Sequence, residues 1–236
     1  MRRVKNRIHI TAGELDQIAK CPGSFNNLEN IWQNRICHKC YVYSKLGQYV
    51  FQRAFRGGNQ PSISTLTKRY KTILINDREF TEEHAGRLAR KDAAVISDLL
   101  SLSSRLSGQI DSVGQHYELH FGGFTVEGEI DLIIYEEKLY SIVDFACSNY
   151  HPTFLFNYRA LTSSLWLREN YNIEASAVAR VTFGVDERPT MSTMIVNVSS
   201  DFMTNAILYA LSRIQGPATT LPVVFGEHCL GCNLCF

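Results

Sequence analysis

The last eight residues of the chain hold three cysteines, Cys229, Cys232 and Cys235, with two residues between neighbours. A chain of 236 residues can bury enough apolar surface to fold without a disulfide staple, so these thiols need another explanation. Short loops can turn three thiolates toward one soft metal centre, which leaves one coordination position open. A fourth ligand must then come from a distant segment. The tail therefore predicts an iron–sulfur cluster or a zinc site that ties the C-terminus to another part of the chain.

The whole chain contains seven cysteines, and no apolar run approaches the roughly 20 residues of a membrane helix. The basic residues 1–7 lead into no signal-type apolar segment. We therefore expect a cytoplasmic, intracellular protein, encoded by a cell or by a virus acting in its host, whose thiols bind metal rather than form disulfides. The net charge of +1 provides no overall field for nucleic acid, so any such contact must come from local basic patches.

The hydrophobic pattern predicts helices before and after a group of strands. Thr11 is a candidate N-cap with Glu14 three residues later, which is the spacing of a capping box. Period-two alternation predicts three antiparallel strands joined by tight turns, followed by a helix, two strands and a last helix. The predicted helices span residues 11–19, 32–55, 82–106, 154–170 and 201–214, and the predicted strands span residues 117–121, 124–134, 139–145, 175–183 and 191–198. This order predicts an α/β core behind a helical N-terminal part.

Two stretches of the sequence resemble a known family. Residues 10–25 (ITAGELDQIAKCPGSF) look like the opening of RecB-like nucleases that carry an iron–sulfur cluster, a group that includes the CRISPR-associated RecB-family exonucleases and the AddB nuclease domain. Residues 128–132 (GEIDL) and, after a turn, residues 142–145 (IVDF) resemble the PD-(D/E)xK nuclease core. The resemblance covers nearly the whole chain in order, and the cysteine pattern and the two aspartate strands are its specific parts.

The resemblance implies a RecB-like restriction-endonuclease fold, in which helices flank a mixed central sheet and a metal cluster staples the N-terminal helical part to the C-terminus. The implied parts are residues 1–110, the helical part with the first cluster cysteine; residues 111–215, the nuclease-like α/β core; and residues 216–236, the cysteine tail.

The resemblance also implies a [4Fe–4S] cluster, although many relatives have a longer gap before the last cysteine. Its implied ligands are Cys21, Cys229, Cys232 and Cys235. Zinc stays open as an alternative, because a tetrahedral site of four cysteines would accept the same residues. Cys37 and Cys40 form a second CxxC and are candidate extra ligands.

The implied catalytic remnant is the pair Asp131 and Asp144 on adjacent strands. Two such carboxylates can hold Mg²⁺ or Mn²⁺, which polarises a phosphodiester and lowers the pKa of a bound water. The other expected groups are missing. Ala146 stands at the position of the family's lysine, and Phe51 stands at that of its helical histidine. The family's later glutamine and tyrosine have no convincing match here.

Arg159 or Lys138 could supply the missing positive charge, but the pair is expected to be insufficient for catalysis. The candidate nucleic-acid contacts are Lys68, Arg69, Lys71 and Arg159, and solvated helix faces explain the basic patches about equally well. The tyrosines at positions 41, 43, 49 and 70 lie near basic residues in the sequence and could stack on unpaired bases.

We therefore expect an iron–sulfur-containing, catalytically inactive RecB-like nuclease homologue. It would bind single-stranded DNA or DNA ends as an accessory subunit of a replication, recombination, transcription, CRISPR or viral DNA-processing complex. Two alternatives remain open. One is an active, divalent-metal-dependent exonuclease on single-stranded DNA. The other is a purely structural assembly subunit that touches no nucleic acid, which the near-neutral net charge favours over a free-standing DNA-binding protein.

Overall fold

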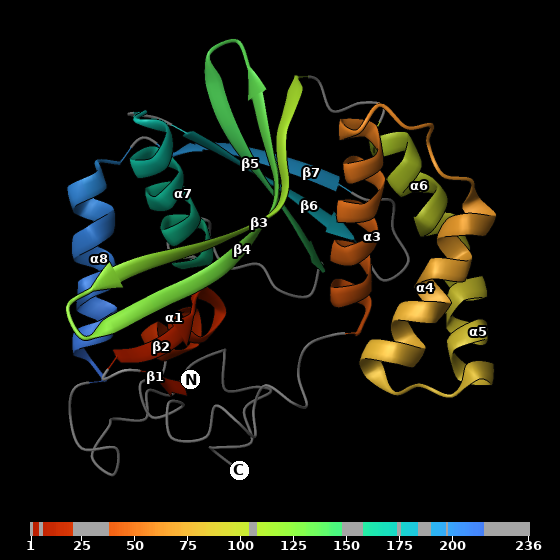
Figure 1. Cartoon of the computed structure of the whole chain (residues 1–236), viewed down its shortest axis with the longest axis horizontal. Coiled ribbons are helices and arrows are strands. Elements are labelled where there is room, and N and C mark those ends of the chain that lie inside the picture. Colours follow the sequence, from red (N-terminus) through yellow and green to blue (C-terminus); the bar gives the residue numbers. More distant parts are fainter. Residues whose placement is uncertain are drawn as a thin grey trace.

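A computed structural model describes residues 2–4, 7–20, 38–103, 108–147, 158–173, 176–183, 190–196 and 198–214. Within them, seven strands form one mixed sheet in the order β1-β2-β4-β5-β6-β7, with β3 paired to β4 off this path (Figure 1). The strands are β1 (Arg2–Val4), β2 (Arg7–Thr11), β3 (Gln109–Phe121), β4 (Phe124–Glu136), β5 (Leu139–Cys147), β6 (Ser176–Phe183) and β7 (Thr190–Val196). The helices are α1 (Ala12–Lys20), α3 (His38–Phe55), α4 (Ile63–Arg78), α5 (Glu82–Lys91), α6 (Ala93–Ser103), α7 (Tyr158–Tyr171) and α8 (Ser200–Ser212).

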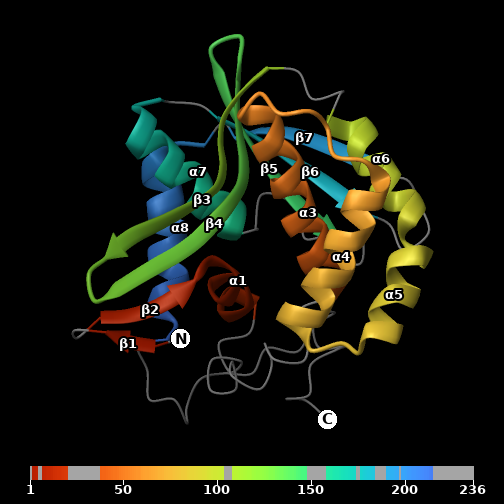
Figure 2. The ribbon, with the colours of Figure 1, turned by 45° about the vertical axis from the view of Figure 1, so that its right-hand side comes forward.

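The helices cover both faces of the sheet (Figures 1 and 2). Side chains of α1, α7 and α8 pack with one apolar layer, and those of α3 to α6 pack with the other. On β5, Ile142 belongs to the first layer and its neighbour Val143 to the second, because successive strand residues point to opposite faces. The prediction of an α/β fold with a mixed sheet between helices is confirmed. None of the helices in the described ranges is long and apolar enough to cross a membrane.

The central strands follow the predicted meander. β3 pairs antiparallel with β4, and β4 pairs antiparallel with β5. The second hairpin turns through Glu137 and Lys138, which both adopt positive φ, as a two-residue hairpin turn of type I′ requires. The chain then crosses through α7 into β6, which lies parallel to β5. This crossover places the start of α7 over the end of β5.

The first helix begins as the sequence predicts. The N–H of Glu14 donates to Oγ1 of Thr11 at 3.1 Å, and the N–H of Thr11 donates to Oε2 of Glu14 at 2.7 Å. Two backbone donors that a helix leaves unpaired are thus satisfied reciprocally, so the capping-box prediction is confirmed.

Helix α4 was not predicted. Its sequence is rich in β-branched isoleucine and threonine, which lowers helix propensity and hides the pattern. Ser62 caps its start by accepting from the N–H of Thr65 at 3.2 Å. Burial of Leu66, Tyr70 and Leu74 against α3, α5 and α6 supplies the stability that propensity does not.

Two other segments differ from the sequence-based prediction. The single helix predicted over residues 82–106 is divided at Asp92, whose buried carboxylate accepts a hydrogen bond from Tyr70. Strands β1 and β2 were not predicted, and β2 joins the sheet parallel to β4. Of the helix predicted from residue 32, the part from residue 38 onward is present and residues 32–37 lie outside the described ranges.

Candidate functional site

Asp131 and Asp144 face each other across β4 and β5. Leu132 is the partner of Val143 in this antiparallel ladder. Asp131, which precedes Leu132, therefore lies opposite Asp144, which follows Val143. Both residues are buried, with 2% and 8% of their surfaces exposed. The structure therefore brings together the two acids that the sequence singled out. Two carboxylates buried side by side repel each other and require a cation or a proton.

Asp131 is held by donors from two other elements. Its Oδ1 accepts from Oγ of Ser44 at 2.6 Å and from Nε2 of Gln48 at 2.8 Å, and its Oδ2 accepts from the N–H of Phe145 at 2.9 Å. Sequence reasoning missed Ser44 and Gln48. Their spacing of four residues places them on one face of α3, and this polar pair on a helix that packs against apolar strands was the available signal.

Arg159 supplies the cation between the two acids. Its Nη2 lies 3.3 Å from Oδ2 of Asp131 and 2.9 Å from Oδ1 of Asp144. Burial raises the pKa of Asp131 above its usual range, although Arg159 acts in the opposite direction. The charge of Asp144, ahead of that of Asp131, raises the pKa of Arg159, so the guanidinium stays protonated.

Of the two candidates for the missing charge, the structure places only Arg159 at the acids. Lys138 is exposed in the turn between β4 and β5. Asp144 lies six positions after Lys138, along strand β5, which is about 20 Å at the rise of a β-strand. The hypothesis that Lys138 completes the site is therefore wrong.

Glu129 extends the acidic group toward the surface. It lies two positions before Asp131 on β4 and accepts hydrogen bonds from Gln48 and from Nζ of Lys45, the latter at 3.2 Å. His116 lies across the β3–β4 ladder, with its Nε2 3.5 Å from Oε2 of Glu129. Burial alone would raise the pKa of Glu129, but the hydrogen bond from Gln48 and the charge of Lys45 bring the pKa below its usual range.

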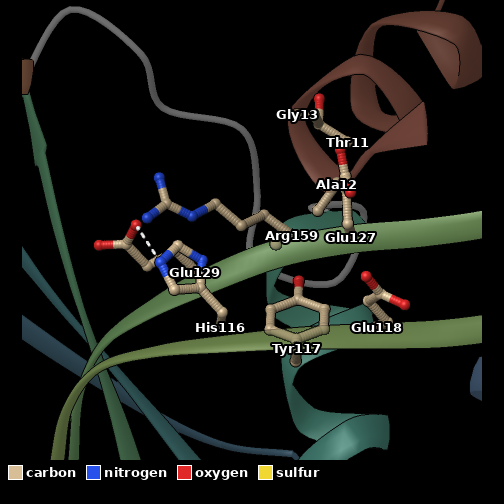
Figure 3. Close-up of a pocket in the computed structure, with 10 residues that line it drawn as sticks. Thr11, Ala12, Gly13, His116, Tyr117, Glu118, Glu127, Glu129 and Arg159 are labelled. Atoms are coloured by element: carbon tan, nitrogen blue, oxygen red, sulfur yellow. Dashed lines mark ion pairs between the residues drawn. The ribbon is translucent and has the colours of Figure 1, made fainter. Parts of the chain in front are cut away.

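An open pocket of about 580 Å³ shares Glu129 and Arg159 with the small space at the acid pair. Figure 3 shows the residues that line it. Its walls come from the start of α1, from β3 and β4, and from Arg159. Three of the lining side chains are carboxylates, Glu118, Glu127 and Glu129. An acidic wall repels phosphate, so this pocket is poorly suited to the backbone of a nucleic acid.

Tyr117 forms the floor between this pocket and α7. Its ring lies against the backbone of Gly128, where an added Cβ would stand 2.4 Å from the ring. Its hydroxyl is 2.7 Å from Oγ1 of Thr162, and burial raises its pKa to about 12. The glycine of the GEIDL stretch is therefore needed for the close approach of this ring.

A catalytic divalent ion does not fit at the acid pair. The free space among Asp131, Asp144 and Arg159 is about 10 Å³, which holds at most one water. Mg²⁺ keeps several waters in an octahedral shell and needs far more room. Phe51, where the resemblance implies a histidine, is buried with its ring stacked on Phe145 at 5.9 Å between centroids. Among the residues that the structure describes, no group of three or more His, Cys, Asp or Glu side chains could hold a metal ion.

Three of the four basic residues predicted to contact nucleic acid lie on α4, and the fourth, Arg159, lies on α7, where it pairs with the acids instead. Lys68 and Arg69 are exposed, and Nζ of Lys71 pairs with Oε1 of Glu82 at 2.7 Å. The guanidinium of Arg69 lies over the ring of Tyr49 at 4.1 Å, and that of Arg78 lies over the ring of Tyr41 at 4.3 Å. The other two tyrosines with a suggested stacking role, Tyr43 and Tyr70, are buried in the core, so that hypothesis is wrong for them.

The cysteines proposed as cluster ligands lie almost wholly outside the described residues. This holds for Cys21, Cys37, Cys229, Cys232 and Cys235. The backbone of Cys40 lies in the first turn of α3. The predicted ligand set therefore stays a prediction.

No protein-family model matches the sequence, and no curated protein sequence matches it. Among solved structures, the chain is similar to a crystal structure of a protein from Eubacterium rectale that carries the provisional name exonuclease. The TM-score is 0.52 and the identity 15%, over 100% of this chain and 92% of that one. A crystal structure of SSO0001 matches with a TM-score of 0.39 and 13% identity, over 98% of this chain and 85% of that one. At such identities the first likeness concerns the fold alone, and the second carries no argument.

Proposed function

We propose that this chain has a nuclease-like fold that no longer cleaves DNA and that it binds single-stranded DNA or DNA ends through its helical part. In this proposal it acts as an accessory subunit of a DNA-processing complex, in replication, recombination, transcription, CRISPR adaptation or a viral counterpart. The observation that carries the proposal is the surface of α3 and α4, where arginine guanidinium groups lie over tyrosine rings.

Charge is unevenly distributed along the chain. Residues 38–103 contain eleven lysines and arginines against six aspartates and glutamates, a net charge of +5. The whole chain carries +1, so the remaining residues carry −4. Affinity for nucleic acid comes largely from cations that displace counterions from phosphates. The low net charge of the chain is therefore the sum of a basic helical part and an acidic remainder. The helical part is better suited to binding phosphates than the acidic pocket is.

The arginine–tyrosine pairs give this surface a chemistry suited to unpaired bases. Tyr41 and Tyr49 lie eight residues apart on α3, about 12 Å along a helix. The guanidinium of Arg78 lies over the ring of Tyr41, and those of Arg69 and Arg53 lie over the ring of Tyr49, at 4.1 and 6.0 Å. Nη1 of Arg53 also lies 3.3 Å from the hydroxyl of Tyr49. Bases stack on aromatic rings and on guanidinium planes without regard to sequence. Such a surface favours single strands over duplex DNA.

We further propose that a [4Fe–4S] cluster joins the two ends of the chain, with zinc as the alternative metal. The supporting contact is between α1 and α8, where Nη1 of Arg213 donates to the carbonyl oxygen of Ala19 at 3.0 Å. Cys21 follows α1 by one residue, and the segment with the three tail cysteines follows α8. The end of α1, next to Cys21, and the end of α8 therefore lie side by side, which supports a shared ligand set.

The cluster is tested on anaerobically purified protein by measuring iron, zinc and acid-labile sulfide. We expect about four irons and four sulfides per chain, because that is the composition of a [4Fe–4S] cluster. Substitution of Cys232 by serine should abolish most of this content, since serine lacks the thiolate. If the protein contains zinc and no sulfide, the site is a structural zinc site and not an iron–sulfur cluster.

The DNA proposal is tested with end-labelled single-stranded DNA and a duplex of the same sequence, on protein whose metal content has been confirmed. We expect binding of the single strand that weakens with salt, and no cleavage in Mg²⁺ or Mn²⁺. Cleavage that Asp131→Ala abolishes would establish the active exonuclease instead. Absence of binding at low salt, together with stable co-purification of another protein, would establish the assembly subunit.

A further inference from the structure

The two buried carboxylates have a cation of their own. An ion pair that loses one partner in a protein interior leaves an uncompensated buried charge, which is strongly destabilising. Here one nitrogen of Arg159 reaches both Asp131 and Asp144, at 3.3 and 2.9 Å. A single guanidinium therefore bridges this pair as a metal ion would, but it supplies one positive charge where a divalent ion would supply two.

The backbone around Arg159 is fixed by contacts on both sides. The N–H of Tyr158 donates to Oδ1 of Asp16 on α1 at 3.2 Å. The carbonyl oxygen of Arg159 accepts from Oγ1 of Thr162 at 3.2 Å and from Oγ of Ser163 at 2.8 Å. The start of α7 is thereby held against the acid pair, so the position of the guanidinium is a property of the fold rather than of a loose surface side chain.

The side chain of Arg159 also separates the acid pair from solvent. It lines both the small space at the aspartates and the open pocket beside them, and 40% of it is exposed. Glu129 lines the same two spaces and adds to the field that holds the guanidinium in place. Removal of this one side chain would open the aspartates to the pocket and leave Asp131 and Asp144 without the guanidinium that they share.

We propose that Arg159 occupies the place that a divalent ion would take between Asp131 and Asp144, and that the chain conceals a cation site that this arginine keeps closed. The guanidinium provides the charge but offers no open coordination position, so it preserves the architecture of the site while excluding metal chemistry. The inference holds whether or not the chain binds nucleic acid, because it concerns stability and ion binding alone.

The test compares Arg159→Ala with Arg90→Ala in the full chain. Arg90 is exposed on α5, so its substitution removes the same charge without uncovering the acids. We expect Arg159→Ala to lower the melting temperature by about 10 °C, and Arg90→Ala to leave it nearly unchanged. Mn²⁺ should raise the melting temperature of Arg159→Ala alone, and titration followed by electron paramagnetic resonance should detect about one additional bound Mn²⁺ in that variant.

The double variant Arg159→Ala/Asp144→Asn keeps the proposal testable if the single variant does not fold. It removes a carboxylate together with the cation, so it should melt well above Arg159→Ala and should no longer respond to Mn²⁺. The proposal would be overturned by a folded Arg159→Ala protein that binds no more Mn²⁺ than the wild type. A double variant less stable than Arg159→Ala would overturn it as well.

Discussion

The acid pair and the basic helical surface of this protein differ in where their charges lie, which is in the interior for the first and at the surface for the second. At the acid pair, Asp131 and Asp144 are buried and share the positive charge of Arg159, which the fold itself supplies. On α4, Lys68 and Arg69 are exposed, and no carboxylate within the described residues lies at ion-pair distance from either. Charges that pair with one another in the interior contribute to holding the folded structure together. Cations left at the surface beside aromatic rings are suited to an anionic partner.

The largest effect is expected from Asp131→Ala. This change leaves the donors from Ser44, Gln48 and Phe145 without their acceptor and leaves Arg159 with one carboxylate fewer. We expect the free energy of unfolding to fall by about 3–5 kcal/mol in denaturant titrations followed by circular dichroism. The exposed Glu169 on α7 is the control, and its substitution by alanine should cost less than about 0.5 kcal/mol. An equal loss of unfolding free energy in the two variants would show that the buried aspartate contributes no more to stability than the exposed glutamate.

A smaller loss is expected from Gly128→Ala, which tests how closely the acid-pair region is packed. The new Cβ would stand 2.4 Å from the ring of Tyr117, so the ring must move and its contact with Thr162 is strained. We expect a destabilisation of about 1–3 kcal/mol in the same titrations. Gly123 in the β3–β4 turn is a matched control, because a Cβ there meets nothing within 4 Å. A tolerated Gly128→Ala would mean that this region is less rigid than its contacts indicate.

The basic surface is tested by Lys68→Ala/Arg69→Ala. Loss of two phosphate-facing cations should weaken binding of single-stranded DNA about tenfold and reduce the slope of log K against log salt by about 1.4. Fluorescence anisotropy at several salt concentrations measures both values. The exposed Lys138, which lies outside residues 38–103, provides the control substitution Lys138→Gln. If both proteins lose affinity equally, the binding surface is not on α4.

The last prediction concerns the pH dependence of stability and tests the buried region alone. Burial raises the pKa of Tyr117 from 10.0 to about 12, so the folded protein keeps a proton that the unfolded chain releases near pH 10. The contribution of the Tyr117 hydroxyl to the free energy of unfolding is fully present below pH 10. It is lost as pH rises toward 12, by about 1.4 kcal/mol per pH unit. The unfolding free energy of Tyr117→Phe should therefore fall less steeply than that of the wild type between pH 10 and 12. Parallel curves would show that the hydroxyl is not buried in solution.

Much of the fold follows from local patterns that the sequence displays. The capping box of α1, the β3–β4–β5 meander and the α7 crossover depend on residues a few positions apart, and these predictions are confirmed. Helix α4 escaped prediction because its β-branched residues weaken the local signal and burial against neighbouring helices decides its structure. The pairing of β2 with β4 escaped because more than a hundred residues separate them.

By itself, the sequence determined which residues carry the chemistry: two aspartates on adjacent strands, no lysine where the resemblance implies one, and clustered cysteines. Only the tertiary structure decided what the acids bind. Ser44 and Gln48 come from 87 and 83 positions before Asp131, and Arg159 from 28 positions after it. Such partners meet because the packing of α3 and α7 on opposite faces of the sheet brings them together, and no local period in the sequence encodes that meeting. Short-range sequence patterns therefore predict which acidic residues form the site, whereas the packing of helices on the sheet determines which cation lies between them.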